Sequence, residues 1–141
     1  TNDFAYPMDS YARSCALVRT EKNYSIQLKM RHGHIFDFPE FFVFADQYLK
    51  KGVPMPIVSR PTLKNGELST KVVSSTKILT ARLHFTTGPH TKNKTRPWTT
   101  RDLTLAGNNI EGGGPPDDAT AWYVEVTDER KAVASSEVMI R

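Results

Sequence analysis

Two histidines separated by one residue are the side chains whose types and spacing most directly suggest chemistry. His32 and His34 lie in the stretch Met30-Arg31-His32-Gly33-His34, which follows an alternating run of apolar and polar residues. Residues two apart face the same side of an extended chain, so both imidazoles could bind one metal ion. Further ligands would have to come from other histidines or carboxylates, and these follow no metal-ligand pattern.

A general base is the alternative role for one of these histidines. Such a histidine lies on a loop after a strand, where its ring reaches a nucleophile and a carboxylate orients it. Gly33 permits a sharp turn and favours His32 as the base, with His34 as the alternative. Asp3 precedes His32 by 29 positions (32 − 3). This spacing suits a triad acid that is followed by one helix and one strand before the histidine.

The elements that would position these residues occupy the first 53 residues. Helical periodicity predicts a helix after Pro7 with Asp9 or Ser10 as its N-cap, and alternation predicts a strand over 24–30. A second helix is expected over 39–51, capped by Asp37. Its buried stripe would consist of Phe41, Phe44, Ala45, Tyr48 and Leu49.

The rest of the chain has a different pattern. A proline-rich connector is expected over 54–66, and five strand-like segments rich in Val, Thr and aromatic residues follow within 67–141. Turn clusters separate these segments, as is typical of an antiparallel β-sandwich of the immunoglobulin or fibronectin kind. The predicted fold class is therefore mixed: a short helix–strand–helix α/β piece followed by a sandwich.

The composition narrows the functional classes. The chain has 141 residues, a net charge of +4 and a single cysteine, Cys15, which excludes an internal disulfide and a cysteine-based zinc site. Its basic residues are scattered among acidic ones and form no nucleic-acid docking motif. No apolar run is long enough to cross a bilayer, and no cofactor is implied.

The N-terminal stretch resembles the C-terminal end of α/β-hydrolases of the acetyl xylan esterase, cephalosporin-C deacetylase and dienelactone-hydrolase type. The resemblance rests on Thr1-Asn2-Asp3, on the M-x-H-x-H stretch ending at His34, and on the segment from Glu40 to Asp46. It implies that Asp3 is the triad acid and His32 the triad base of a bacterial enzyme, and that the protein is periplasmic or secreted. The stretches ARLHFTTG, WTTRDLTL and AWYVEVTDER resemble a sandwich carried by some members.

The chain departs from this family in having no G-x-S-x-G nucleophile motif. We therefore expect the C-terminal portion of a Ser-Asp-His ester hydrolase, inactive alone, whose partners are the upstream hydrolase domain and an ester or acetylated carbohydrate. The apolar helix face would pack on the sandwich or in a homodimer. The alternative is a non-enzymatic module that binds carbohydrate through Trp98, which we expect to be the more exposed tryptophan.

Overall fold

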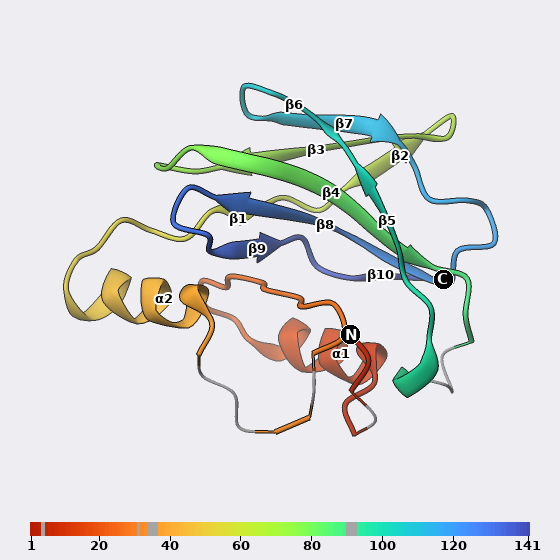
Figure 1. Cartoon of the computed structure of the whole chain (residues 1–141), viewed down its shortest axis with the longest axis horizontal. Helices are drawn as coiled ribbons and strands as arrows, with labels where there is room; N and C mark the ends of the chain where they lie inside the picture. The colour runs from red at the N-terminus through yellow and green to blue at the C-terminus, as the bar shows by residue number, and fades with distance from the viewer. Residues whose placement is uncertain (4, 31, 34–36, 90–92) are drawn as a thin grey trace.

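The computed structural model describes residues 1–3, 5–30, 32–33, 37–89 and 93–141. Two helices come first, α1 over Met8–Leu17 and α2 over Pro39–Leu49, and strands follow. Figure 1 shows both helices on one side of the strands, in the red and orange part of the chain. The protein is thus a mixed α+β chain in which two N-terminal helices precede two packed antiparallel sheets, consistent with a β-sandwich.

The first sheet has the order β1-β3-β7-β6, with β2 paired to β3 outside this path. Its strands are β1 (Ile57–Val58), β2 (Thr62–Lys64), β3 (Glu67–Val73), β6 (Thr104–Ala106) and β7 (Asn109–Gly113). The alternation of β3 is plain, since Leu68, Thr70 and Val72 are buried while the residues between them are exposed. One face of this sheet therefore meets the core and the other faces solvent.

The second sheet has the order β10-β8-β4-β5, with β9 paired to β8. Its strands are β4 (Ile78–Thr86), β5 (Thr99–Asp102), β8 (Ala121–Asp128), β9 (Val133–Ser135) and β10 (Met139–Ile140). β8 is buried almost throughout, on both of its faces. Strands that are covered on both faces lose the polar alternation of a surface strand, which here marks the second sheet as the middle layer.

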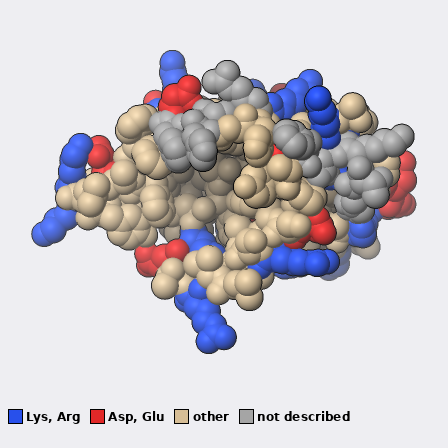
Figure 2. All heavy atoms as spheres, turned by 90° about the horizontal axis from the view of Figure 1, so that it is seen from below, with Lys and Arg blue, Asp and Glu red and all other residues tan. Residues whose placement is uncertain are grey.

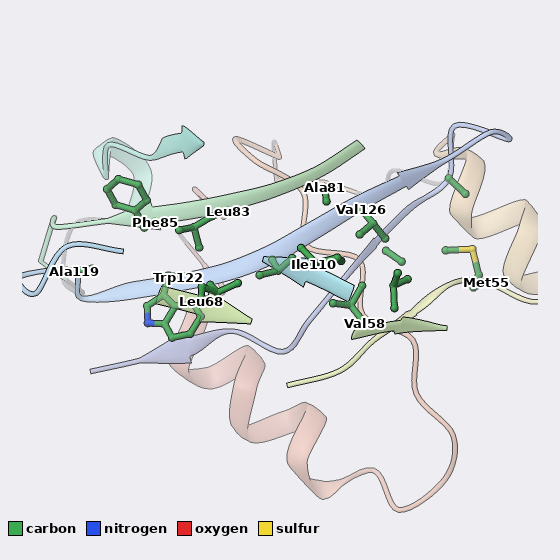
Figure 3. Close-up of a cluster of buried hydrophobic side chains, with 14 residues drawn as sticks. Met55, Val58, Leu68, Ala81, Leu83, Phe85, Ile110, Ala119, Trp122 and Val126 are labelled. Atoms are coloured by element: carbon green, nitrogen blue, oxygen red, sulfur yellow. The ribbon is translucent and has the colours of Figure 1, made fainter. Parts of the chain in front are cut away.

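The main core lies between the two sheets. In Figure 3 side chains from both sheets meet there, among them Leu68 and Ile110 from the first sheet and Leu83 and Trp122 from the second. A second buried cluster lies on the opposite face of the second sheet. There Met8 and Ile26 pack against Ala121, Tyr123 and Val138. Residues of the N-terminal part therefore form a third layer on the sandwich.

Several expected elements differ in the structure. Residues 24–30 form no strand; Tyr24 makes one isolated bridge to Ser135, because no further strand lies beside this segment among the described residues. The N-caps are Pro7 and Phe38, neither with a side-chain cap hydrogen bond, so Asp9, Ser10 and Asp37 were wrong as caps. The ends of both helices otherwise lie close to the predicted ones.

The predicted buried stripe of α2 is wrong. Phe41, Phe44, Tyr48 and Leu49 are exposed, Leu49 by 81%. The helix contacts β9 and buries Glu40 instead, with Val43 packed against the core. The expected burial of this face against the sandwich is therefore also wrong, because α2 meets the sandwich through Glu40 and Val43.

The sequence pattern also missed one strand pairing and one register shift. Residues 109–113 lie within the stretch GNNIEGGGPPDD, one of the expected turn clusters, but Asn109–Gly113 pairs with β3 along its whole length as β7. Gly107 permits the tight β6–β7 turn through its φ of +59°, a conformation that favours glycine. In the sequence Leu79 alternates with Ala81, Leu83 and Phe85, but the register of β4 shifts between Ile78 and Thr80, and Leu79 is exposed.

Candidate functional site

Asp3 and His32 lie side by side. Nδ1 of His32 is 3.0 Å from Oδ2 of Asp3 and 3.1 Å from its Oδ1. The side chain of His32 is 44% exposed and that of Asp3 22%. A carboxylate at Nδ1 accepts the proton of that nitrogen and thereby holds the ring in one orientation and one tautomer. The arrangement is that of an acid orienting a base.

The turn after Asp3 fixes the carboxylate. Oδ1 of Asp3 accepts hydrogen bonds from the backbone N–H of Ala5 at 2.7 Å and of Tyr6 at 3.3 Å, just before helix α1 begins. An aspartate that bonds its own following backbone in this way forms an Asx turn. Desolvation works to raise the pKa of Asp3, but these N–H groups and the His32 ring together hold it below its usual value. Asp3 is thus kept as a carboxylate.

The histidine comes shortly after the segment 24–30, which turns at residues 28–29. Lys29 and Gly33 have φ angles of 52° and 144°, so the chain turns sharply on either side of His32. The ring of Tyr6 stacks on the His32 ring with centroids 5.8 Å apart. Tyr6 therefore contacts the base from the same turn that carries the acid, a contact that the sequence reasoning did not foresee.

A cavity of about 470 Å³ opens beside this pair. Asp3, Tyr6, His32 and Gly33 line one side of it, and Met8, Tyr11 and Ile26 are among its apolar wall. Burial raises the pKa of Tyr11, and the neighbouring Cys15 raises it further, so the phenol stays protonated. A largely apolar cavity beside a few polar groups is the usual form of a small-molecule site.

A second hollow of about 580 Å³ lies on the other side of the pair. Its walls come from two distant parts of the chain, with Asn2, Asp3, Lys29, Met30 and His32 on one side and Lys94, Thr95, Arg96 and Pro97 on the other. The sandwich therefore contributes one wall of a groove at the Asp3–His32 pair.

Three serines of the strand-rich part hydrogen-bond backbone groups. Ser135 Oγ accepts from the N–H of Ile26 at 3.3 Å, and Ser136 Oγ accepts from that of Val124 at 3.0 Å. Ser74 Oγ bonds within its own turn, to the carbonyl oxygen of Thr76 at 2.8 Å. Ser25, which the sequence reasoning passed over, lines the cavity and donates to Glu40 at 3.2 Å. None of these serines lies on a strand-to-helix elbow in the described chain.

The remaining predicted site residues are His34 and Trp98. His34, the alternative base and second metal ligand, lies outside the described residues. Trp98 is the more exposed of the two tryptophans, but it is half-buried and its ring meets Tyr123 edge-on with centroids 5.6 Å apart. Within the described chain, no three His, Cys, Asp or Glu side chains are grouped to hold a metal ion.

A buried polar pair also lies beneath the N-terminal layer. Nε2 of His84 is 3.3 Å from Oε2 of Glu125, without hydrogen-bond alignment, and Nδ1 of His84 is 2.9 Å from Oγ1 of Thr100. Both rings of the His84–Tyr123 contact are buried, with centroids 5.0 Å apart. The sequence could have predicted this pair only if both faces of β4 and β8 had been expected to be buried, so that alternation put His84 and Glu125 on the same buried face.

The fold and the site together define a mixed α+β protein with a carboxylate–histidine pair at the junction of its N-terminal layer and its sandwich. No family model matches the sequence, and no curated protein matches it. Among the helices of the described chain, none is long and apolar enough to span a membrane.

Proposed function

We propose that this chain is the C-terminal portion of a Ser-Asp-His carboxylic ester hydrolase of the α/β-hydrolase type, with an immunoglobulin- or fibronectin-like sandwich. The observation that carries the proposal is the contact of His32 Nδ1 with the Asp3 carboxylate, at 3.0 Å, beside a cavity. Asp3 orients the ring, and Nε2 of His32 takes the proton of a serine hydroxyl as that oxygen attacks the ester carbonyl.

The serine belongs, in this proposal, to the upstream hydrolase domain of the parent chain. The 141 residues contain no G-x-S-x-G motif, so the chain by itself lacks the nucleophile and the adjacent oxyanion-hole donor. The substrate is a carboxylic ester, for which acetylated carbohydrate is the class that the resemblance implies. Without nucleophile and oxyanion hole, the chain alone leaves esters unhydrolysed.

The exposed face of α2 supports the same assignment. Phe41, Phe42, Phe44, Tyr48 and Leu49 are between 41% and 81% exposed, although a helix of this composition normally buries such a face. Figure 2, seen from below, shows mostly uncharged residues over the middle of the molecule's lower side, with many charged side chains toward the rim. The hydrolase domain of the parent chain is the partner that would cover the helix.

The experiment starts with the coding sequence upstream of Thr1. If it encodes a G-x-S-x-G between a predicted strand and helix, the longer protein should hydrolyse a small aryl acetate, whereas residues 1–141 alone should not. Asp3→Asn in the longer protein should lower kcat by about 10⁴-fold, the loss known for the equivalent change in a serine protease. His32→Ala should abolish turnover.

Lys50→Ala provides the matched control, because Lys50 is exposed and pairs with Asp46 on the surface of α2. Its activity should equal that of the unmodified protein. Full activity of the His32→Ala protein would show that His32 is not the base and would end the proposal.

A further inference from the structure

Asn2 ties the turn that carries Asp3 to the sandwich. Its Nδ2 donates to the carbonyl oxygen of Arg96 at 2.9 Å and to that of Lys94 at 3.4 Å. These carbonyls belong to the loop 93–97, which is the later part of the connection between β4 and β5 and includes the 3-10 turn Asn93–Thr95. The residue directly before the acid is therefore anchored on a part of the chain more than 90 positions away.

The same turn is also bound to the segment that leads to the histidine. Oγ1 of Thr1 donates to Oδ1 of Asn2 at 2.8 Å and accepts from the N–H of Lys29 at 3.0 Å. The nitrogen of Thr1 donates to the carbonyl oxygen of Gln27 at 2.7 Å. Thr1 and Asn2 thus link three segments at one point: the acid turn, the stretch before His32 and the loop 93–97.

The loop is itself bonded to the first residues of the same β4–β5 connection, and these are bonded to Thr120 just before β8. Arg96 is 2% exposed, and its Nε and Nη2 donate to the carbonyl oxygen of Pro89 at 3.3 and 3.1 Å. Oγ1 of Thr120, next to β8, donates to the carbonyl oxygen of Gly88 at 2.7 Å. A turn at the surface would otherwise be free to move. Its hydrogen bonds to this loop restrict the movement of Asp3 relative to the sheet.

We infer that Asn2 is a positioning residue for the Asp3–His32 pair, and that the loop 93–97 of the sandwich is a structural part of the catalytic site. The inference rests on the proposed function and deepens it. Asn2 does not touch the reacting atoms; it holds Asp3 at the distance at which the carboxylate accepts the Nδ1 proton of His32. The sandwich then acts in catalysis by holding the acid.

The tautomer of neutral His32 reports this arrangement without any need for turnover. A carboxylate at Nδ1 favours the Nδ1–H form, whereas a neutral imidazole in water prefers the Nε2–H form. The ¹⁵N spectrum of the imidazoles of residues 1–141, labelled at histidine and recorded at alkaline pH, distinguishes the two forms. His32 is assigned by comparison with a His32→Gln protein.

Four variants make the test. Asp3→Asn removes the carboxylate itself. Asn2→Ala removes the anchor, and Asn2→Asp keeps the oxygen that accepts from Thr1 but removes the donor, which guards against a folding defect of the alanine protein. Asn23→Ala is the matched control, because it deletes another side-chain amide that donates to a backbone carbonyl, that of Pro56 at 3.3 Å, away from the pair. Dispersed amide spectra establish that each variant is folded.

The expected result is loss of the Nδ1–H form in the Asp3→Asn, Asn2→Ala and Asn2→Asp proteins, and its retention in the Asn23→Ala protein. Retention of the Nδ1–H form in both folded Asn2 variants, with loss in Asp3→Asn, would overturn the role of Asn2 and leave the proposed function standing. Retention of the same form in Asp3→Asn as well would show that Asp3 does not orient His32. The proposed function and the inference would then fail together.

Discussion

The Oδ2 atom of Asp3 lies 3.0 Å from Nδ1 of His32, although the two residues are 29 positions apart in the chain. Helix α1 and the segment 24–30 lie between them in the sequence, and the chain returns to the turn that carries Asp3. The acid is fixed by its own turn and the base by the turn at Gly33, so two short local structures meet at one contact.

The first prediction concerns the carboxyl group of Asp3. His32→Asn should raise the pKa of Asp3 toward its ordinary value of about 3.9, because one of the groups that favour the carboxylate is lost. The pKa should stay below that value, since the hydrogen bond from Ala5 remains. The ¹³C shift of the Asp3 carboxyl carbon, followed through an acid titration, measures it.

The direction in which folding stability depends on pH follows from the lowered pKa of Asp3. Asp3 stabilises the folded state above its ordinary pKa, and this contribution disappears as the pH falls through the lowered folded value. Lys50→Ala, on the far helix, should leave the titration of Asp3 unchanged. An unchanged titration in the His32→Asn protein would contradict the contact.

The second prediction concerns the exposed face of α2. In the isolated chain these apolar side chains should associate with a second copy, because exposed patches of this kind are costly in water. A Phe41→Ser, Phe44→Ser, Tyr48→Ser triple variant should be monomeric by light scattering and equally helical by circular dichroism. A wild-type chain that stays monomeric at its highest soluble concentration would contradict the prediction.

The third prediction concerns Asp128, which is fully buried at the end of β8. Its carboxylate accepts from the N–H groups of Arg130 and Ala132, from Oγ1 of Thr76 and from the guanidinium of Arg130. Asp128→Ala should lower the free energy of unfolding by about 3 kcal/mol, because buried donors lose their acceptor at about 1–3 kcal/mol each. Urea denaturation at neutral pH measures this loss.

Desolvation works to raise the pKa of Asp128, but the Arg130 and Thr76 hydrogen bonds and the Ala132 N–H keep it below its usual value. The difference between the wild-type and the Asp128→Ala protein should therefore be full at neutral pH and shrink as the medium is acidified below about pH 4. Asp102→Ala is the control, because Asp102 is 89% exposed in its pair with Arg82, and such pairs contribute only about 0–1 kcal/mol. Equal losses of unfolding free energy in the Asp128→Ala and Asp102→Ala proteins would contradict this prediction.

The fourth prediction concerns the His84–Glu125 pair. His84→Leu should cost about 3–5 kcal/mol of stability, since the carboxylate of Glu125 stays buried without its partner. The double variant with Glu125→Leu should lose less than the sum of the two single losses, by about 0.5–3 kcal/mol. Thermal or urea unfolding of the four proteins measures the coupling, and simple additivity would show that the two residues act independently.

Sequence alternation predicted well which residues of β4 face the main core. The alternation of Ala81, Leu83 and Phe85 places them in the core as expected, because each strand residue two positions on returns to the same face. The contact between Asp3 and His32 was also expected from their spacing and chain order. Its catalytic role stays a prediction.

Sequence patterns failed where distant segments decide the outcome. The segment 24–30 alternates like a strand, but a strand needs a neighbour, and the described chain offers it only the bridge at Ser135. The apolar face of α2 was also predicted wrongly. Helical periodicity predicts that this face is buried, but whether it is buried depends on a partner surface that periodicity does not reveal. Asn2 carries no signal at all, because its role depends on two carbonyl oxygens of a loop whose position the sequence does not reveal.

The N-terminal layer packs on the sandwich across the domain boundary that the sequence pattern predicts near residue 54. Met8 and Ile26 pack against Ala121 and Tyr123 of β8 and against Val138, which lies just before β10, and all three are almost completely shielded from water. Removal of the residues before the connector would expose this face of the second sheet to water, including the ring of Tyr123 and the buried His84. We therefore expect the sandwich to be less stable on its own than in the whole chain, because part of its buried apolar surface is covered by the residues that precede it.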